Sequence, residues 1–168
     1  MKSYREVTEF LYAQLPMYQR IGNKAFKKDL TNIRKLCDMM GNPEYSVPMI
    51  HIAGTNGKGS VSHILSAMFQ DVGLNVGLYT SPHYIDFRER IRYNADPISK
   101  DEVVQFVEKY ESLFAEVTPS FFEWSFALAL FFFEYRRPDV AIIETGLGGR
   151  LDSTNIIHPI LSVITNVS

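Results

Sequence analysis

The sequence predicts an α/β fold of three layers, with helices on both faces of a mostly parallel sheet. The first observation is a strand–helix–strand pattern: an apolar strand over 49–53, apolar residues at helical spacing over 61–72, and a second strand over 76–80. Such a βαβ unit requires parallel strands and a right-handed crossover. Two further apolar runs, 139–144 and 160–166, predict additional strands. Residues 121–137 form a helical segment that is apolar nearly all round, which indicates burial against the sheet.

The composition describes one globular domain and excludes some classes of partner. With 168 residues, 46% of them hydrophobic, the chain is long enough to bury a substantial core. Its net charge of −2 gives no electrostatic footprint for nucleic acid or for an anionic membrane. The longest apolar run, 126–133, is too short to span a bilayer, and charged residues punctuate the start where a secretory signal would be apolar. We therefore expect a cytoplasmic protein, with the single cysteine, Cys37, as a small core residue.

Two helices are predicted before the first strand. The first spans residues 3–15 and carries Val7, Phe10 and Leu11 on one face. A loop over 16–23 follows it. The second helix spans 26–40, and Gly41 ends it.

A glycine-rich turn, Gly54-Thr-Asn-Gly-Lys-Gly-Ser60, joins the first strand to the helix over 61–72. Turns of this kind expose backbone N–H groups at a helix N-terminus, where these groups bind phosphate. Lys58 adds a charge suited to the β- and γ-phosphates and is the candidate catalytic residue. The turn is shorter than the strict phosphate-loop pattern, and the alternative is a Gly/Asn turn with a solvated lysine. We predict that ATP is bound by Asn56, Gly57, Lys58, Gly59 and Ser60.

Two residues at the carboxyl ends of predicted strands are candidates for ligand binding. Ser81 follows the strand over 76–80, at the edge where open α/β sheets bind ligands. Glu144 ends the strand over 139–144, as the metal-binding carboxylate does in phosphate-loop enzymes. Mg²⁺ prefers oxygen ligands, so Glu144 is the candidate metal ligand. The alternatives are a turn hydroxyl at Ser81 and an exposed carboxylate at Glu144.

The segment between these candidates carries charges and a further helix. Arg88, Glu89, Arg90 and Arg92 form a cluster that indicates either a solvated turn or groups that meet the carboxylates of a substrate. Ser99-Lys-Asp-Glu102 resembles a capping box and predicts a helix that runs to about residue 114. Residues 115–120 are predicted to form a loop that leads into the apolar helix.

Four segments resemble the folylpolyglutamate synthase/dihydrofolate synthase family, a branch of the Mur-type amide ligases. They are the turn at 54–60, Thr-Ser-Pro-His at 80–83, Phe-Arg-Glu-Arg-Ile at 87–91, and Glu-x-Gly-x-Gly-Gly-Arg-Leu-Asp-Ser-Thr-Asn at 144–155. The resemblance implies the phosphate-loop NTPase-like topology of the Mur ligase central domain, and it implies that Ser81 is a magnesium ligand. Ser120 and Phe122 match a Ser/Thr-x-Phe-Glu pattern in which the aromatic ring packs near a pterin. We name Arg90 as the candidate for a substrate carboxylate.

The resemblance further implies an ATP-dependent ligase of folate biosynthesis. ATP would phosphorylate a carboxylate of dihydropteroate or of a folate, and the amine of L-glutamate would attack the acyl phosphate. We expect a monomeric, bifunctional enzyme that accepts both. Family members continue with a metal-binding histidine, a carbamylated lysine and a C-terminal glutamate-binding domain. The resemblance thus implies that residues 1–168 are an incomplete N-terminal ATP-binding domain, apparently truncated, from which we expect no turnover alone.

Two other functions remain open at this point. The first is a Mur-type ligase of peptidoglycan synthesis that acts on a nucleotide-linked muramyl acid. The Ser-Pro-His and Arg-Glu-Arg-Ile segments argue against it. The second is a nucleotide-binding protein without ligase activity, which would hydrolyse ATP at a rate indifferent to pterins.

Overall fold

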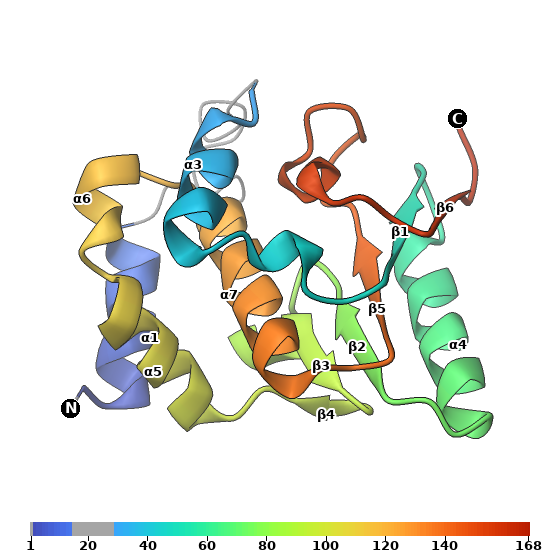
Figure 1. Cartoon of the computed structure of the whole chain (residues 1–168), viewed down its shortest axis with the longest axis horizontal. Helices are drawn as coiled ribbons and strands as arrows, with labels where there is room; N and C mark the ends of the chain where they lie inside the picture. The colour runs from blue at the N-terminus through green and yellow to red at the C-terminus, as the bar shows by residue number, and fades with distance from the viewer. Residues whose placement is uncertain (1, 15–28) are drawn as a thin grey trace.

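A computed structural model describes residues 2–14 and 29–168 of the chain. Its centre is a six-stranded sheet in the order β4-β3-β2-β5-β1-β6 (Figure 1). The parallel pairs are β2–β5, β5–β1 and β1–β6, and β3 and β4 extend one edge in antiparallel pairing. The strands are β1 (Met49–Ala53), β2 (Val76–Tyr79), β3 (Ile91–Tyr93), β4 (Asp96–Pro97), β5 (Val140–Glu144) and β6 (Leu161–Ile164). The predicted mostly parallel sheet is confirmed, and the sequence pattern does not predict β3 or β4.

Helices cover both faces of the sheet, which confirms the predicted three layers. Helix α4 (Lys58–Asp71) lies on one face, and α3 (Thr31–Met40) and α7 (Phe121–Arg136) lie on the other (Figure 1). On the α7 side the structure adds α1 (Tyr4–Gln14), α5 (Lys100–Tyr110) and α6 (Leu113–Val117). The 3₁₀-helices are η2 (Pro43–Tyr45), η3 (Phe87–Arg90) and η4 (Ser153–Ile156).

The core consists of two clusters separated by the sheet, because successive strand residues point to opposite faces. Ile142 packs in the cluster on the α4 side, and its neighbours Ala141 and Ile143 pack in the cluster under α7. The second cluster is the larger one and contains Trp124, which is almost fully buried. Cys37 also lies there, buried as predicted.

The second predicted helix begins later than its apolar pattern indicates. It starts at Thr31, and residues 26–28, like the predicted loop over 16–23, lie outside the described residues. Asp29 and Leu30 are not helical. The Thr31 N–H group donates to Asp29 Oδ1 at 2.9 Å, so Asp29 forms a local turn ahead of the helix.

The predicted helix from 99 to about 114 is confirmed up to Tyr110 and is then interrupted by a turn at residues 111 and 112. Helix α5 ends at Tyr110, and α6 begins at Leu113, so residues 115–117 are helical and not part of a loop. The turn between the two helices places the Phe114 ring 5.0 Å from the Phe10 ring and 3.8 Å from the Trp124 ring, between ring centroids. Aromatic packing therefore outweighs the continuous helical pattern.

Helix α4 begins three residues before the predicted range, at Lys58, directly after the glycine-rich turn. Its apolar positions divide into two sets. Val61, Leu65 and Phe69 pack against the sheet, whereas Ile64, Met68 and Val72 are exposed. The small residues Ser62 and Ser66 are buried, which allows the helix to approach the sheet closely.

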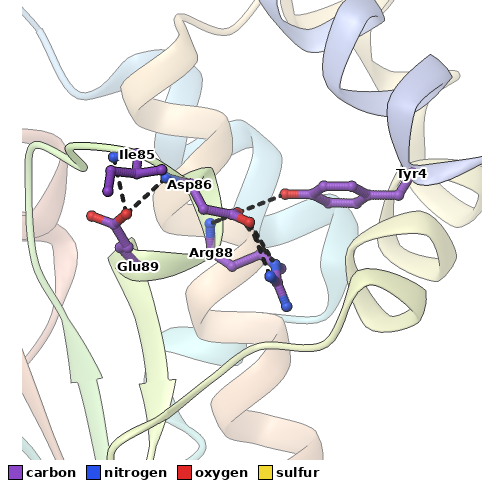
Figure 2. Close-up of polar contacts among 5 residues, drawn as sticks. All are labelled: Tyr4, Ile85, Asp86, Arg88 and Glu89. Carbon is purple, nitrogen blue, oxygen red and sulfur yellow. Dashed lines mark hydrogen bonds and ion pairs between the residues drawn. The ribbon is translucent and has the colours of Figure 1, made fainter.

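The charged segment around η3 is ordered by its own carboxylates (Figure 2). Asp86 Oδ1 accepts from Tyr4 Oη at 3.0 Å, which fixes helix α1 to η3. Asp86 Oδ2 accepts from Arg88 Nη2 at 2.9 Å. The Glu89 carboxylate accepts from the backbone N–H groups of Tyr84, Ile85 and Asp86 at 2.9, 3.0 and 2.7 Å.

These contacts predict an acid-sensitive contribution of Asp86 to stability. Burial acts to raise the pKa of Asp86, but the hydrogen bonds from Arg88 and Tyr4, with the Arg88 charge, outweigh it and lower the pKa to about 2. Because an unfolded aspartate titrates near about 3.9, the contribution is present above about pH 4 and is lost as the pH falls towards about 2. We expect Asp86→Asn to lower the melting temperature at pH 6, with a gap to wild type that narrows below pH 4.

The measurement is thermal unfolding followed by circular dichroism between pH 2 and pH 6. Arg88→Gln removes the main partner of Asp86 and should show the same narrowing. A gap between wild type and Asp86→Asn that stays constant over this range would contradict the prediction.

Within the described part of the chain, no helix combines the length and apolar character needed to cross a membrane.

Candidate phosphate- and metal-binding site

The glycine-rich turn places the start of α4 at the carboxyl edge of the sheet. β1 ends at Ala53, and α4 begins at Lys58 with Gly57 as its N-cap at φ +80°, a conformation that favours glycine. In the described part of the chain no side chain caps α4, whereas Ser99 caps α5 and Ser120 caps α7. The first N–H groups of α4 therefore lack a side-chain acceptor, as at helix N-termini that bind anions.

Contacts from residues after β6 hold the turn in shape. Thr165 Oγ1 donates to the Asn56 carbonyl at 2.6 Å, and Asn166 Oδ1 accepts from the Asn56 N–H group at 2.8 Å. Lys58 Nζ donates to the Gly54 carbonyl at 3.0 Å. The Asn56 N–H group and the Lys58 ammonium group thus have protein acceptors, which a phosphate would replace.

The structure brings Ser81 and Glu144 together. The Ser81 N–H group donates to Glu144 Oε2 at 3.0 Å, because β2 and β5 are adjacent parallel strands whose carboxyl ends meet. The Glu144 side chain also faces the start of α4, since a Cβ atom at Gly59 would lie 3.6 Å from Glu144 Oε1. Glu144 is only 4% exposed, so the alternative of an exposed carboxylate is wrong.

The environment of Glu144 suits a hard cation. Burial raises the pKa of the Glu144 carboxyl group, and the Ser81 hydrogen bond and the charges of Lys58 and Arg90 act against this rise. Among the described residues, only the Ser81 N–H group donates a hydrogen bond to the Glu144 carboxylate. The other lone pairs of its two oxygens are therefore available to a cation. Mg²⁺ fits such a donor set, because it uses few protein oxygens and retains several waters. Residues 2–14 and 29–168 contain no cluster of three His, Cys, Asp or Glu side chains for a metal.

Asp152 organises the glycine-rich loop after β5, and the sequence analysis misses it. Its Oδ2 accepts from the Gly146 and Leu147 N–H groups at 2.9 and 2.8 Å. Its Oδ1 accepts from the Thr154 N–H group at 3.0 Å and from the Thr154 hydroxyl at 2.5 Å. That hydroxyl lies 2.8 Å from Nε2 of the buried His51, which ties the loop to β1. The Asp-x-Thr spacing of a helix cap is the signal that identifies Asp152.

Helix α7 begins beside the same loop. A Cβ atom at Gly146 would lie 2.6 Å from the Phe122 ring, so this ring packs directly on the loop backbone. Ser120 Oγ accepts from the Glu123 N–H group at 3.2 Å, and Glu123 Oε2 accepts from the Ser120 N–H group at 2.6 Å. Phe122 is thus adjacent to the loop after Glu144, whereas the Ser120 hydroxyl serves as a helix cap.

Arg90 is not part of a solvated turn, so that interpretation of the charged cluster is wrong for this residue. Its side chain is only 5% exposed. Arg90 Nε donates to His83 Nδ1 at 2.7 Å, and the guanidinium group lies 5.2 Å from the centroid of the Phe121 ring. The apolar surroundings bury it on the side of the sheet that α7 covers.

Comparisons with known proteins find folylpolyglutamate and dihydrofolate synthases among the relatives of this chain. The chain is 40% identical over 148 residues to a dihydrofolate synthase/folylpolyglutamate synthase of Bacillus subtilis, which covers 84% of this chain and 34% of that protein. It matches the crystal structure of folylpolyglutamate synthase from Thermotoga maritima with a TM-score of 0.88 and 40% identity, covering 98% of this chain and 38% of that one. It matches a folylpolyglutamate synthase complex with AMPPCP and folate with a TM-score of 0.83 and 35% identity, covering 97% and 40%. No protein-family model matches the chain.

The chain spans 34% to 40% of the length of these relatives, while the relatives cover most or nearly all of the chain.

Proposed function

Since this chain belongs to the folylpolyglutamate synthase/dihydrofolate synthase family, we propose that it forms the ATP-binding part of a ligase that joins L-glutamate to a pterin-linked carboxylate. One observation carries this proposal. The uncapped start of α4, Lys58 and the Ser81–Glu144 pair converge at one edge of the sheet. Phosphoryl transfer requires that the reactants are positioned and that the phosphate charge is neutralised, and it needs no protein nucleophile. The groups at this edge can provide the positioning and the positive charge.

The proposed reaction has two steps. A carboxylate oxygen of dihydropteroate or of a folate attacks the γ-phosphorus of ATP, and ADP leaves. The amine of L-glutamate then attacks the acyl carbon, the bond from that carbon to the phosphate oxygen breaks, and the amine loses a proton. The products are an amide, ADP and inorganic phosphate.

The residues of the chain would divide these tasks. The turn from Asn56 to Gly57 and the N–H groups of Lys58, Gly59 and Ser60 bind the phosphates of ATP. The Lys58 ammonium group moves from the Gly54 carbonyl to the transferring phosphoryl group and stabilises its charge. Ser81 and Glu144 would hold Mg²⁺, which would neutralise negative charge on the phosphate oxygens.

The side of the sheet under α7 would receive the acceptor. The Phe122 ring, packed on the loop after Glu144, supports a place for the flat pterin there, with Ser120 at the adjoining helix start. The Bacillus subtilis relative is named for both reactions, which supports a bifunctional enzyme that accepts dihydropteroate and folates. We propose that residues 1–168 form an N-terminal ATP-binding domain of a monomeric, cytoplasmic enzyme.

The test measures ADP release and product mass in the protein as its gene encodes it, with Mg²⁺, ATP and L-glutamate. Dihydropteroate and tetrahydrofolate are offered separately. The proposal predicts ADP release that requires both glutamate and a pterin acceptor. ADP release at the same rate with and without a pterin would indicate a nucleotide hydrolase. ADP release that requires a muramyl acid in place of a pterin would indicate a peptidoglycan ligase.

A further inference from the structure

Arg90 is a buried cation that forms no direct ion pair with any of the described residues. Its side chain is 95% removed from solvent, and none of the ion pairs among the described residues includes it. The residues outside the description, 1 and 15–28, contain no aspartate or glutamate. Transfer of a charged group into a protein interior is costly unless an opposite charge accompanies it. Among residues 2–14 and 29–168, no carboxylate lies within ion-pair distance of Arg90.

The nearest carboxylates along the chain are engaged elsewhere (Figure 2). Asp86 forms its ion pair with Arg88 at 2.9 Å and accepts from Tyr4. Glu89 accepts three backbone N–H groups of the preceding turn. The carboxylates of Asp86 and Glu89 thus stabilise the loop, and neither forms an ion pair with Arg90.

Neutral and aromatic groups surround Arg90 instead. His83 accepts from Arg90 Nε, and the Phe121 ring lies under the guanidinium group. The Phe121 ring stacks on the Tyr12 ring with centroids 5.7 Å apart, and the Phe87 ring meets it edge-on at 5.7 Å. Flat rings therefore surround the guanidinium group, and an aromatic acid is the kind of anion that suits such surroundings.

Arg90 also adjoins the candidate site. Its carbonyl accepts from the Thr80 N–H group at 2.9 Å, directly before Ser81. The phosphate-binding turn leads into α4 on the opposite face of the sheet, whereas Arg90 packs with the rings on the α7 side.

We propose that Arg90 binds the reacting carboxylate of the acceptor, an aromatic acid of the pteroate type. This inference rests on the proposed function and names the group that selects its substrate. The guanidinium group supplies the charge that a carboxylate needs, and Lys58 and the start of α4 remain for the phosphates. Arg90 therefore distinguishes a carboxylate acceptor from its uncharged amide, and it does not affect nucleotide affinity.

The test compares dihydropteroate with its carboxamide analogue by isothermal titration calorimetry, in wild type and in Arg90→Gln. Wild type should bind the carboxylate about 10- to 100-fold more tightly than the carboxamide, the range expected for hydrogen bonds to a charged group. Arg90→Gln should bind both equally and weakly, with its affinity for AMPPCP, measured without Mg²⁺, unchanged. The matched control, Arg88→Gln, lies two residues away and should keep the preference.

Stability gives a second readout. Because Arg90 forms no direct ion pair with the described residues, Arg90→Gln should melt no lower than wild type without ligand. A carboxylate preference retained in Arg90→Gln, or a loss of AMPPCP affinity instead, would overturn the inference. If Arg90→Gln does not fold, the inference is also overturned unless Arg90→Lys folds and shows a reduced preference. A wild-type protein that neither binds dihydropteroate nor releases ADP with glutamate would instead overturn the proposed function itself.

Discussion

Lys58→Ala should lower the rate of glutamate-dependent ADP release by about 10²- to 10³-fold, the loss typical of removing one group that stabilises developing charge. In the structure the Lys58 ammonium group donates to the Gly54 carbonyl within the turn. This hydrogen bond keeps the ammonium group close to the first N–H groups of α4, which have no side-chain acceptor among the described residues. The effect should appear mainly in kcat, because the backbone still binds the phosphates.

The matched control is Lys100→Ala. Lys100 is the first residue of α5 as Lys58 is the first residue of α4, but Ser99 caps α5. A lysine at the start of a capped helix, away from the candidate site, should have no effect on kcat. Equal losses in the two variants would show that the Lys58 effect is not specific to phosphate chemistry.

Glu144→Gln should abolish the response of the protein to Mg²⁺. The substitution keeps the size of the side chain and removes the charge that a hard cation requires. In wild type, Mg²⁺ with AMPPCP should raise the melting temperature, since a ligand that binds only the folded state stabilises it. We expect this rise to vanish in Glu144→Gln and ADP release to fall by about 10²-fold or more.

The same variant should be no less stable than wild type without ligand. Burial raises the pKa of Glu144, which means that the ionised carboxylate costs stability at neutral pH. A glutamine removes that cost. The matched control is Glu44→Gln, a second buried glutamate with an unpaired oxygen among the described residues. It should leave the Mg²⁺ response intact, and a lost response there would contradict the assignment of the metal to Glu144.

Local signals predict the elements that meet at the site. The strand Met49–Ala53 is predicted with its observed bounds, because Pro48 and Gly54 enclose a short apolar run. The capping box at Ser99 is confirmed because both of its hydrogen bonds lie within four residues. The convergence of Ser81 and Glu144 follows from parallel strands whose carboxyl ends share one edge. Each of these rests on neighbouring residues or on a general rule of sheet topology.

Features that depend on distant contacts are not predictable in this way. Strands β3 and β4 are three and two residues long, so they carry no clear alternating pattern. The break between α5 and α6 accompanies ring packing by Phe114 against Phe10, near the start of the chain, and against Trp124 in the next helix. Arg90 lies in a charged cluster that is typical of a solvated surface, and only the fold reveals its burial. Asp152 acts through hydrogen bonds to a loop whose shape the sequence does not define.

The most direct test of the ligase chemistry follows an oxygen atom. Dihydropteroate labelled with ¹⁸O in its carboxylate is offered with Mg²⁺, ATP and L-glutamate to the protein as its gene encodes it. The account predicts one ¹⁸O atom in the inorganic phosphate and an amide product heavier by the added glutamate, because an acyl phosphate passes that oxygen to phosphorus. Unlabelled phosphate, released with or without the pterin, would contradict ligation through an acyl phosphate.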